Sequence, residues 1–354
     1  MRCVCRARER ACGGGGHGVN TNEDDVPCIA AQWLAEGRKV ALGTVMKTWG
    51  SAPRQPGSQI AVRDDGAFVG SVSGGCVEGA VIEHARAAME DGQVRRLEFG
   101  VADQMAWSVG LTCGGRIEIF VEPIDGAASR NTFQALNVAR QARRSLVRAV
   151  DLATGEHRLI DPSTDTSALN PAASEAIRTD RSASVEVDGR SWLLVVFNPP
   201  IDLVIVGAVH VAQPLTKMAA QCGYDVRVMD PRTSFATEAR FPGVVLSHEW
   251  PDEALAKRPL GARSALIALA HDPKLDDPAL SAALSSQAFY IGALGSKRTH
   301  ASRLERLKAH GFSDDALARI HGPVGLSIGA KTPAEIAVSI MAQITERLRV
   351  LPQS

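Results

Sequence analysis

The sequence has no excess of charge of either sign, few aromatic residues and no long apolar segment. Its 354 residues include 39 Lys and Arg against 39 Asp and Glu, so no global field attracts nucleic acid or an anionic membrane. Aromatic residues make up 5% and hydrophobic residues 45%, as in domains with aliphatic cores. No apolar run reaches the roughly 18 residues that a membrane span needs. These absences favour a cytoplasmic protein that acts on neither nucleic acid nor membrane.

Cysteines are few, and their distribution does not suggest a disulfide framework. Three of the seven lie in the amino-terminal stretch "CVCRARERACGGGGH", which has no secretion signal and which we expect to belong to a disordered leader, 1–25. A small metal-binding tract is the alternative for this stretch. Cys28, Cys76, Cys113 and Cys222 lie far apart, so we expect them to be reduced thiols.

Residues 26–198 are predicted to form a mixed α+β domain. A short helix at 26–36 precedes three strands separated by turns, and the next helix ends at Gly92. The stretch "VGLTCGGRIEIFVEP" then leads into a strand with alternating apolar and charged residues. Residues 126–150 have the pattern of a helix, and two hairpins follow, separated by a polar stretch at 162–182.

Residues 199–354 are predicted to form a Rossmann-like, doubly wound parallel sheet, so the whole chain is of the α/β class. A buried strand enters the turn Gly207-Ala-Val-His-Val-Ala212, and a helix and a second strand ending at Asp230 follow. Val209 occupies the position where a dinucleotide fold has glycine because the backbone must approach a pyrophosphate. The predicted fold therefore stands, but a hydride-transferring NAD enzyme is disfavoured.

Two cysteines are flanked by glycines, in "GGC" at Cys76 and "CGG" at Cys113. Buried small residues beside glycine turns are the common outcome for isolated cysteines. A helix start, however, stabilises a thiolate, and glycines leave backbone N–H groups open to an anion. No Cys or His pair lies at zinc spacing, and His84 is predicted on an apolar helical face, where it would not serve a cysteine nucleophile. An anion-binding or sulfur-binding pocket is the remaining functional hypothesis.

Basic residues at predicted turns and helix starts are further candidates. Arg54 lies in the turn "SAPRQPG", and Ser296-Lys297-Arg298 opens a helix, where N–H groups and a cation can bind phosphate. A solvated first helical turn is the alternative. His210 follows the nucleotide turn, and His271-Asp272 ends a strand, at the edge where such sheets bind ligands.

Several long motifs resemble the XdhC/CoxI family. In the amino-terminal domain they are "GSAPRQPGSQIAV", "GSVSGGCVEGAVIEHA" and "GLTCGGRIEIFVEP". In the second half they are "VIVGAVHVAQPL", "VRVMDPRTSFA", "YIGALGSKR" and "IHGPVGLSIGAKTPAEIAVSIMAQI". The resemblance covers roughly 40–125 and 200–345 of the chain and leaves the leader and 126–198 without a counterpart.

The resemblance implies a maturation factor for molybdenum hydroxylases of the xanthine dehydrogenase type. Such a protein binds the molybdenum cofactor, often as the cytosine dinucleotide, and protects it while a cysteine desulfurase partner installs the sulfido ligand. It then inserts the cofactor into the apo-hydroxylase, and it is a homodimer by resemblance alone. It is not itself an enzyme.

The resemblance also assigns roles to residues of this chain. Cys76 and Cys113 match the two glycine-flanked cysteines of the family and would contact molybdenum. The other cofactor-binding residues are the flanking glycines, the nucleotide turn and the basic candidates: Gly74, Gly75, Gly114, Arg54, Gly207, His210, Asp230, Ser296 and Lys297. Val209 departs from the family's G-A-G-H-V turn. Two alternatives stay open: an NAD(P)-dependent oxidoreductase, and a scaffold that only tethers a sulfur donor to its target.

Overall fold

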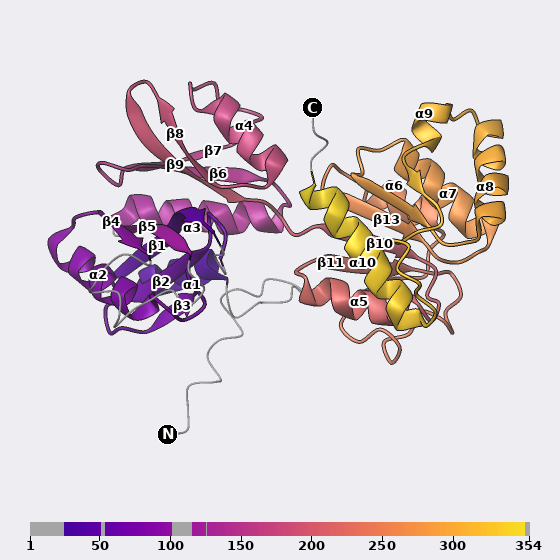
Figure 1. Ribbon diagram of the computed structural model, residues 1–354, viewed down its shortest axis with the longest axis horizontal. Coiled ribbons are helices and arrows are strands. Elements are labelled where there is room, and N and C mark those ends of the chain that lie inside the picture. The colour runs from indigo at the N-terminus through magenta and orange to yellow at the C-terminus, as the bar shows by residue number, and fades with distance from the viewer. Residues whose placement is uncertain (1–24, 51–53, 101–114, 125, 351–354) are drawn as a thin grey trace. The chain divides into compact units, whose positions relative to one another are not determined.

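The computed structural model describes residues 25–50, 54–100, 115–124 and 126–350 (Figure 1). These residues divide between Pro199 and Pro200 into two compact units, each described here by itself. Cys113 and Gly114 lie outside the described residues. Within the described part of the chain, no helix is both long and apolar enough to cross a membrane.

The first unit contains a five-stranded antiparallel sheet with helices on both faces. The strand order is β3-β2-β1-β5-β4, with β1 (Val40–Trp49), β2 (Gln59–Arg63), β3 (Phe68–Gly70), β4 (Arg95–Phe99) and β5 (Arg116–Ile124). Helix α2 (Glu78–Asp91) packs on one face, whereas α1 (Val26–Ala35) and α3 (Gly126–Gln141) cover the other. Because both faces are covered, β1 is buried from Val40 to Met46.

A second, four-stranded antiparallel sheet completes this unit. Its order is β7-β6-β9-β8, with β6 (Leu146–Asp151), β7 (His157–Ile160), β8 (Ala183–Val187), β9 (Arg190–Phe197) and the helix α4 (Asn170–Thr179). Buried Arg148 of β6 and Glu122 of β5 join the two sheets through paired hydrogen bonds of 2.6 and 2.7 Å. The helix predicted over 126–150 is therefore too long, and the polar stretch 162–182 contains a helix that the sequence did not reveal.

The second unit is built on a six-stranded parallel sheet in the order β12-β11-β10-β13-β14-β15. Its strands are β10 (Asp202–Val206), β11 (Asp225–Met229), β12 (Val245–Ser247), β13 (Ser264–Ala268), β14 (Tyr290–Ala293) and β15 (Ile320–His321). In chain order this is 3-2-1-4-5-6, the order of a Rossmann fold. The predicted fold is confirmed: antiparallel sheets in the first unit and a Rossmann sheet in the second.

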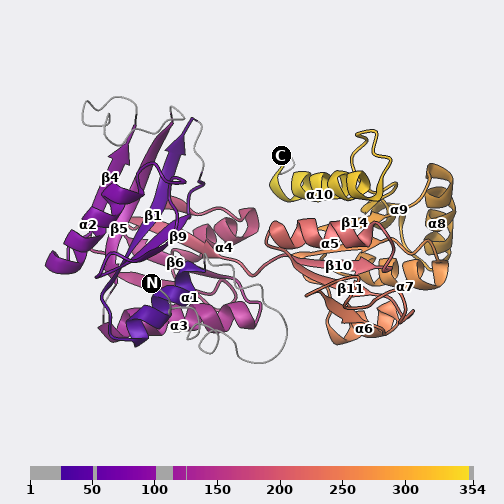
Figure 2. The same cartoon turned by 90° about the horizontal axis from the view of Figure 1, so that it is seen from below.

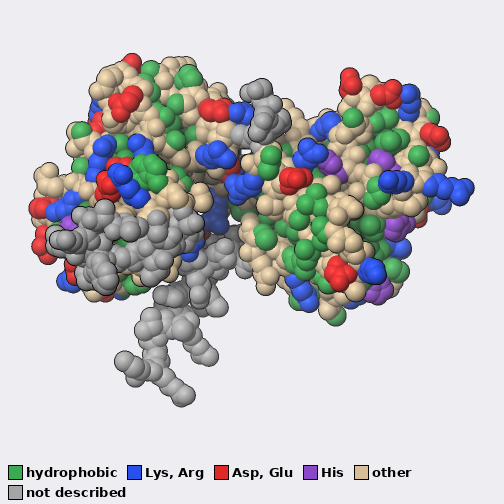
Figure 3. All heavy atoms as spheres, viewed as in Figure 1, with side chains coloured by type: hydrophobic (Ala, Val, Ile, Leu, Met, Phe, Trp, Pro, Cys, Tyr) green, Lys and Arg blue, Asp and Glu red, His purple; other side chains and the backbone are tan. Residues whose placement is uncertain are grey.

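Helices cover both faces of the parallel sheet, as Figure 2 shows. Helices α5 (Ala212–Gln221) and α10 (Pro333–Arg349) pack on one face, and α6 (Pro251–Lys257), α7 (Pro273–Leu284), α8 (Lys297–Ala309) and α9 (Asp314–Leu317) lie on the other. Thr332 and Glu335 form a capping box at the start of α10, with Pro333 at the first helical position. The outer face of α10 leaves Val338 47% exposed, and Figure 3 shows apolar side chains on the surface over α5 and α10.

Candidate functional site

The strand order of the parallel sheet reverses between β10 and β13, and ligands of such sheets bind outside the carboxyl ends of the strands at that point. Gly207, directly after β10, has a φ of +101°. A Cβ atom at Gly207 would lie 2.7 Å from the amide nitrogen of Ala270, which follows β13. The two turns thus approach each other so closely that only glycine fits at Gly207.

Asp230 lies at the end of β11 and is fully buried. Its carboxylate accepts hydrogen bonds from Arg232 at 2.8 and 2.7 Å and from the amide of Ala208 at 2.8 Å. Burial opposes ionisation of Asp230, but these hydrogen bonds outweigh it and lower the pKa of the carboxyl. The Arg232 guanidinium also lies 4.2 Å from the centroid of the Phe235 ring. Asp230 therefore positions the nucleotide turn and Arg232, and its oxygens are not exposed to a ribose.

The remaining residues of the nucleotide turn point in different directions. Val209 is half-buried and packs against the apolar core shared by α5 and α10, whereas His210 is exposed. Helix α5 begins after Val211 without a side-chain cap among the described residues. By contrast, α8 is capped by the hydroxyl of Ser296. Of these two helices, α5 is therefore the one whose first N–H groups have no side-chain cap in the described part of the chain.

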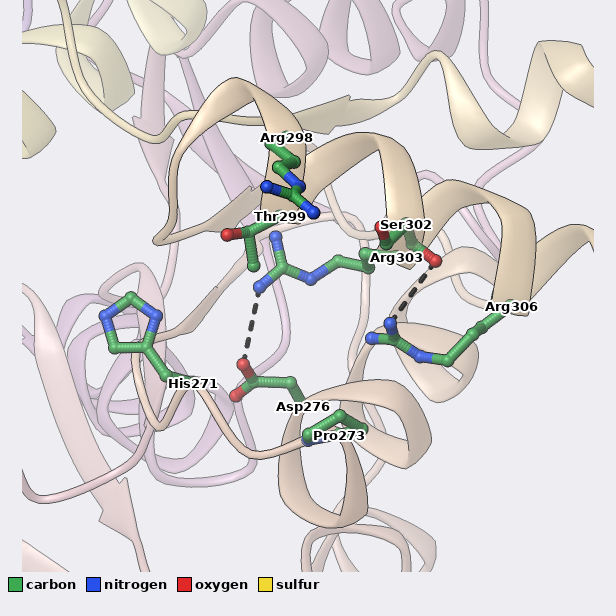
Figure 4. A pocket seen from close by; sticks show the side chains of 8 residues that line it. All are labelled: His271, Pro273, Asp276, Arg298, Thr299, Ser302, Arg303 and Arg306. Carbon is green, nitrogen blue, oxygen red and sulfur yellow. Dashed lines mark hydrogen bonds and ion pairs between the residues drawn. The ribbon is translucent and has the colours of Figure 1, made fainter.

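A pocket of about 270 Å³ opens between the start of α7 and one face of α8 (Figure 4). It lies beyond the carboxyl ends of β13 and β14. One of its lining residues, His271, directly follows Ala270, which contacts Gly207. The α7 side contributes a histidine, a proline and an acid, and the α8 side contributes three arginines and two hydroxyls. The lining residues are His271, Pro273, Asp276, Arg298, Thr299, Ser302, Arg303 and Arg306.

Arg303 is the unusual member of this pocket, because its side chain is only 2% exposed. One of its nitrogens, Nη2, donates to the carbonyl of Leu294 at 2.9 Å and lies 3.5 Å from a carboxylate oxygen of Asp276. Its Nε and Nη1 have no hydrogen-bond partner among the described residues. Figure 4 shows the guanidinium between Asp276 on one side and Arg298 and Thr299 on the other. Buried charged donors of this kind are costly unless an acceptor is supplied.

Of the two titratable neighbours of Arg303, only Asp276 is charged at pH 7, and its carboxylate offsets one of the positive charges of the pocket. Burial raises the pKa of Asp276 to about 6, although the Arg303 charge opposes the rise. Burial and the Arg303 charge lower the pKa of His271, so its imidazole is neutral at pH 7 and can donate one N–H. Arg306, in turn, is bonded to both carboxylate oxygens of Asp277, at 2.6 and 3.0 Å. The charge of the pocket therefore comes from Arg298 and Arg303.

The sequence singled out Ser296, Lys297 and Arg298 at this helix and His271 after β13, and of these four Arg298 and His271 line the pocket. Ser296 caps α8, its hydroxyl accepting from the Thr299 amide at 3.1 Å, and Lys297 is exposed away from the lining. Arg303 was missed. The sequence feature that could have identified Arg303 is its helical spacing, because Thr299, Arg303 and Arg306 recur at intervals of four and three and so share one face of α8.

In the first unit, the loop that carries Cys76 is organised around the carboxylate of Glu78. This side chain belongs to the first turn of α2 and is buried. It accepts six hydrogen bonds from the preceding loop, which come from the hydroxyls of Ser71 and Ser73 and the amides of Val72, Ser73, Gly74 and Gly75. Burial alone would raise the pKa of Glu78, but these hydrogen bonds lower it to about 2.

The Glu78 carboxylate therefore occupies the place expected for an external anion. The amides of Gly74 and Gly75 donate to the Glu78 carboxylate at 3.1 and 2.8 Å, so they are not available as hydrogen-bond donors to a ligand. Both glycines have positive φ angles, 78° and 115°, which the turn around the carboxylate requires. Cys76 is half-buried, retains its thiol and packs at the edge of the core under α2.

Three other expectations can be compared with the first unit. Arg54 is exposed in the turn before β2. His84 is exposed on α2, so its predicted place on the apolar face is wrong; the buried face is formed by Val81, Ala85 and Ala88. Cys28 is disulfide-bonded, so the expectation of a reduced thiol is wrong at that position. In the described residues, no three His, Cys, Asp or Glu side chains gather as a metal site would require.

Comparisons with known proteins agree on one family. The model described as XdhC Rossmann domain matches residues 203–344, and that described as XdhC and CoxI family matches residues 33–100. The chain is 30% identical to the molybdenum cofactor insertion chaperone PaoD of Escherichia coli, over 89% of this chain and 86% of that protein. It is 25% identical to a probable xanthine dehydrogenase subunit of Bacillus subtilis, over 88% and 94%. A solved structure described as a xanthine dehydrogenase from Bacillus halodurans superposes with a TM-score of 0.72 at 26% identity, covering 92% and 96%.

Proposed function

The chain belongs to the XdhC and CoxI family, and we propose that it is a cytoplasmic, non-catalytic chaperone that binds the molybdenum cofactor and inserts it into an apo molybdenum hydroxylase. The observation that carries this proposal is the similarity to the insertion chaperone PaoD along 89% of the chain. The cofactor is cargo here, held while a cysteine desulfurase supplies its sulfido ligand and then released to the hydroxylase.

The two ends of the cargo call for different chemistry. Molybdenum ligated by sulfur is a soft centre, for which we propose contacts with the thiols of Cys76 and Cys113. Because Glu78 uses the amides of the Gly74-Gly75 loop, that loop would offer a thiol held in a fixed backbone rather than an anion site. We propose that the phosphate or dinucleotide end binds at the Rossmann edge, where the start of α5 has no side-chain cap among the described residues.

Metal and nucleotide analysis of the purified chain tests this function. Protein isolated from cofactor-producing cells should carry molybdenum and release a pterin, with CMP after mild hydrolysis if the cargo is the cytosine dinucleotide. Cys76→Ser and Cys113→Ser should each lower the molybdenum content without changing the thermal midpoint. Cys222→Ser, at an exposed thiol of the second unit, is the matched control and should leave the content unchanged. Wild-type protein without molybdenum, or equal loss in the control, would contradict the proposal.

An NAD(P)-dependent oxidoreductase is the alternative from another class. It requires a ribose contact from the acid that ends the second strand, but Asp230 is fully buried and both its oxygens are bonded to Arg232. Titration with NAD(H) and NADP(H) decides it, because saturable binding would favour the enzyme. A tethering scaffold would instead bind the desulfurase equally well with and without cargo, which a pull-down with molybdenum-free protein would reveal.

A further inference from the structure

The α7–α8 pocket contains hydrogen-bond donors that the described residues do not use. Arg303 is buried, yet its Nε and Nη1 have no partner among them. A guanidinium cannot lose its proton, so the missing partner has to be an acceptor. The donors therefore indicate a ligand rather than a change of protonation.

The groups around Arg303 specify the charge of that ligand. Arg306 is neutralised by Asp277, so Arg298 and Arg303 face the single carboxylate of Asp276. This leaves a net positive charge at neutral pH. The start of α8 adds to this positive potential, because the dipole of a helix favours anions at its N-terminus. The ligand is an anion.

The directions of the donors narrow its chemistry further. Figure 4 shows Arg298 and Thr299 above the Arg303 guanidinium, His271 across the pocket, and Ser302 at the main-chain end of the Arg303 side chain. Donors that converge from several sides suit a tetrahedral oxyanion, whose oxygens point in several directions, better than a planar carboxylate. The volume of about 270 Å³ leaves room for more than the phosphoryl group itself.

We propose that this pocket binds the phosphate group of a phosphate ester, with Arg298 and Arg303 as its charged donors and Thr299 as a hydroxyl donor. The site adjoins the nucleotide turn, since Ala270 contacts Gly207 and the next residue, His271, lines the pocket. This inference deepens the proposed function, because the phosphate end of the molybdenum cofactor would bind in this pocket. It rests on the proposed function only for the identity of the phosphate ester.

Calorimetric titration of the full chain with inorganic phosphate and with CMP tests the site. We expect saturable binding of both probes, competition by sulfate and none by acetate. Arg298→Gln should weaken phosphate about tenfold or more, the loss expected for one charge-assisted hydrogen bond, and Arg303→Gln should weaken it at least as much. Lys297→Gln removes the same charge from the adjacent, outward position and should change affinity less than about twofold.

The outcomes separate the site from the proposed function. Absence of saturable binding, acetate binding as tightly as phosphate, or equal loss in Lys297→Gln and Arg298→Gln would each overturn the site. Arg298 is exposed, so its variant decides the question even if Arg303→Gln does not fold. Specific phosphate binding by a chain that never carries molybdenum would leave the pocket standing and refute the cargo instead.

Discussion

Replacing Glu78 with glutamine removes the charge around which the Cys76 loop is built while keeping the side chain's size. The carboxylate accepts six hydrogen bonds from residues 71–75, four of them from backbone amides. The amide of glutamine presents one acceptor oxygen and one donor group to the same loop. Because Oε1 accepts four of the six hydrogen bonds and Oε2 accepts two, at least two of them are lost.

The size of the effect follows from the pKa of Glu78. The folded value of about 2 lies about 2.5 units below the ordinary 4.5, which at 1.36 kcal/mol per unit gives about 3 kcal/mol of stability at pH 7. Because the folded pKa is depressed, this contribution is complete above the unfolded value and is lost as pH falls toward 2. At pH 3 about 1.5 kcal/mol remains.

Urea unfolding of wild type and Glu78→Gln at pH 7 and pH 3 measures both quantities. We expect the difference in unfolding free energy to be about 3 kcal/mol at pH 7 and about half of that at pH 3. Glu83→Gln, at an exposed position of the same helix, is the matched control and should change stability by less than about 0.5 kcal/mol. A Glu78→Gln effect equal to that of the control, or one independent of pH, would refute the role assigned to the carboxylate.

Three further changes have definite expected outcomes. Gly207→Ala should destabilise the chain by about 3 kcal/mol in thermal unfolding, whereas Gly311→Ala, also at positive φ but in open space, should cost about 1 kcal/mol; equal effects would contradict the close approach at Gly207. Glu122→Gln should cost about 3–5 kcal/mol in urea unfolding because it leaves Arg148 buried without its charged partner, and a loss below about 1 kcal/mol would contradict this. Asp276 by itself should remove about 2.5 kcal/mol of stability as pH rises from about 4 to 7, because its folded pKa is raised to about 6. Asp276→Asn should abolish that part of the pH profile, and an unchanged profile would contradict the assignment.

The sequence predicted the parts of the fold that depend on local patterns. The strand–turn–helix at Gly207 is encoded in adjacent residues, so the sequence predicted it. Helix α4 was hidden because its residues are mostly small or polar and only Ala173 and Ala176 are buried. The end of α3 was misplaced because arginines continue past Gln141 into β6, where Arg148 is buried against an acid from another strand.

The candidate site was predictable only in outline. Gly207, Asp230 and the start of α8 were identified because each lies at the end of a recognisable element. Arg303 looks like an ordinary surface residue of a basic helix, and only the packing of α8 on α7 buries it. Glu78 was overlooked for a related reason, since a carboxylate in a first helical turn usually faces solvent.

Glu78 also determines how the Cys76 loop behaves when nothing is bound. The Glu78 carboxylate belongs to the same chain, three residues after Gly75, so its effective concentration at the loop is higher than that of a dissolved anion. The carboxylate consequently holds the loop in this conformation without a bound ligand. Under the proposed carrier function, this counter-ion would hold the Cys76 thiol in place, and no entropic cost of ordering the loop would arise at each transfer.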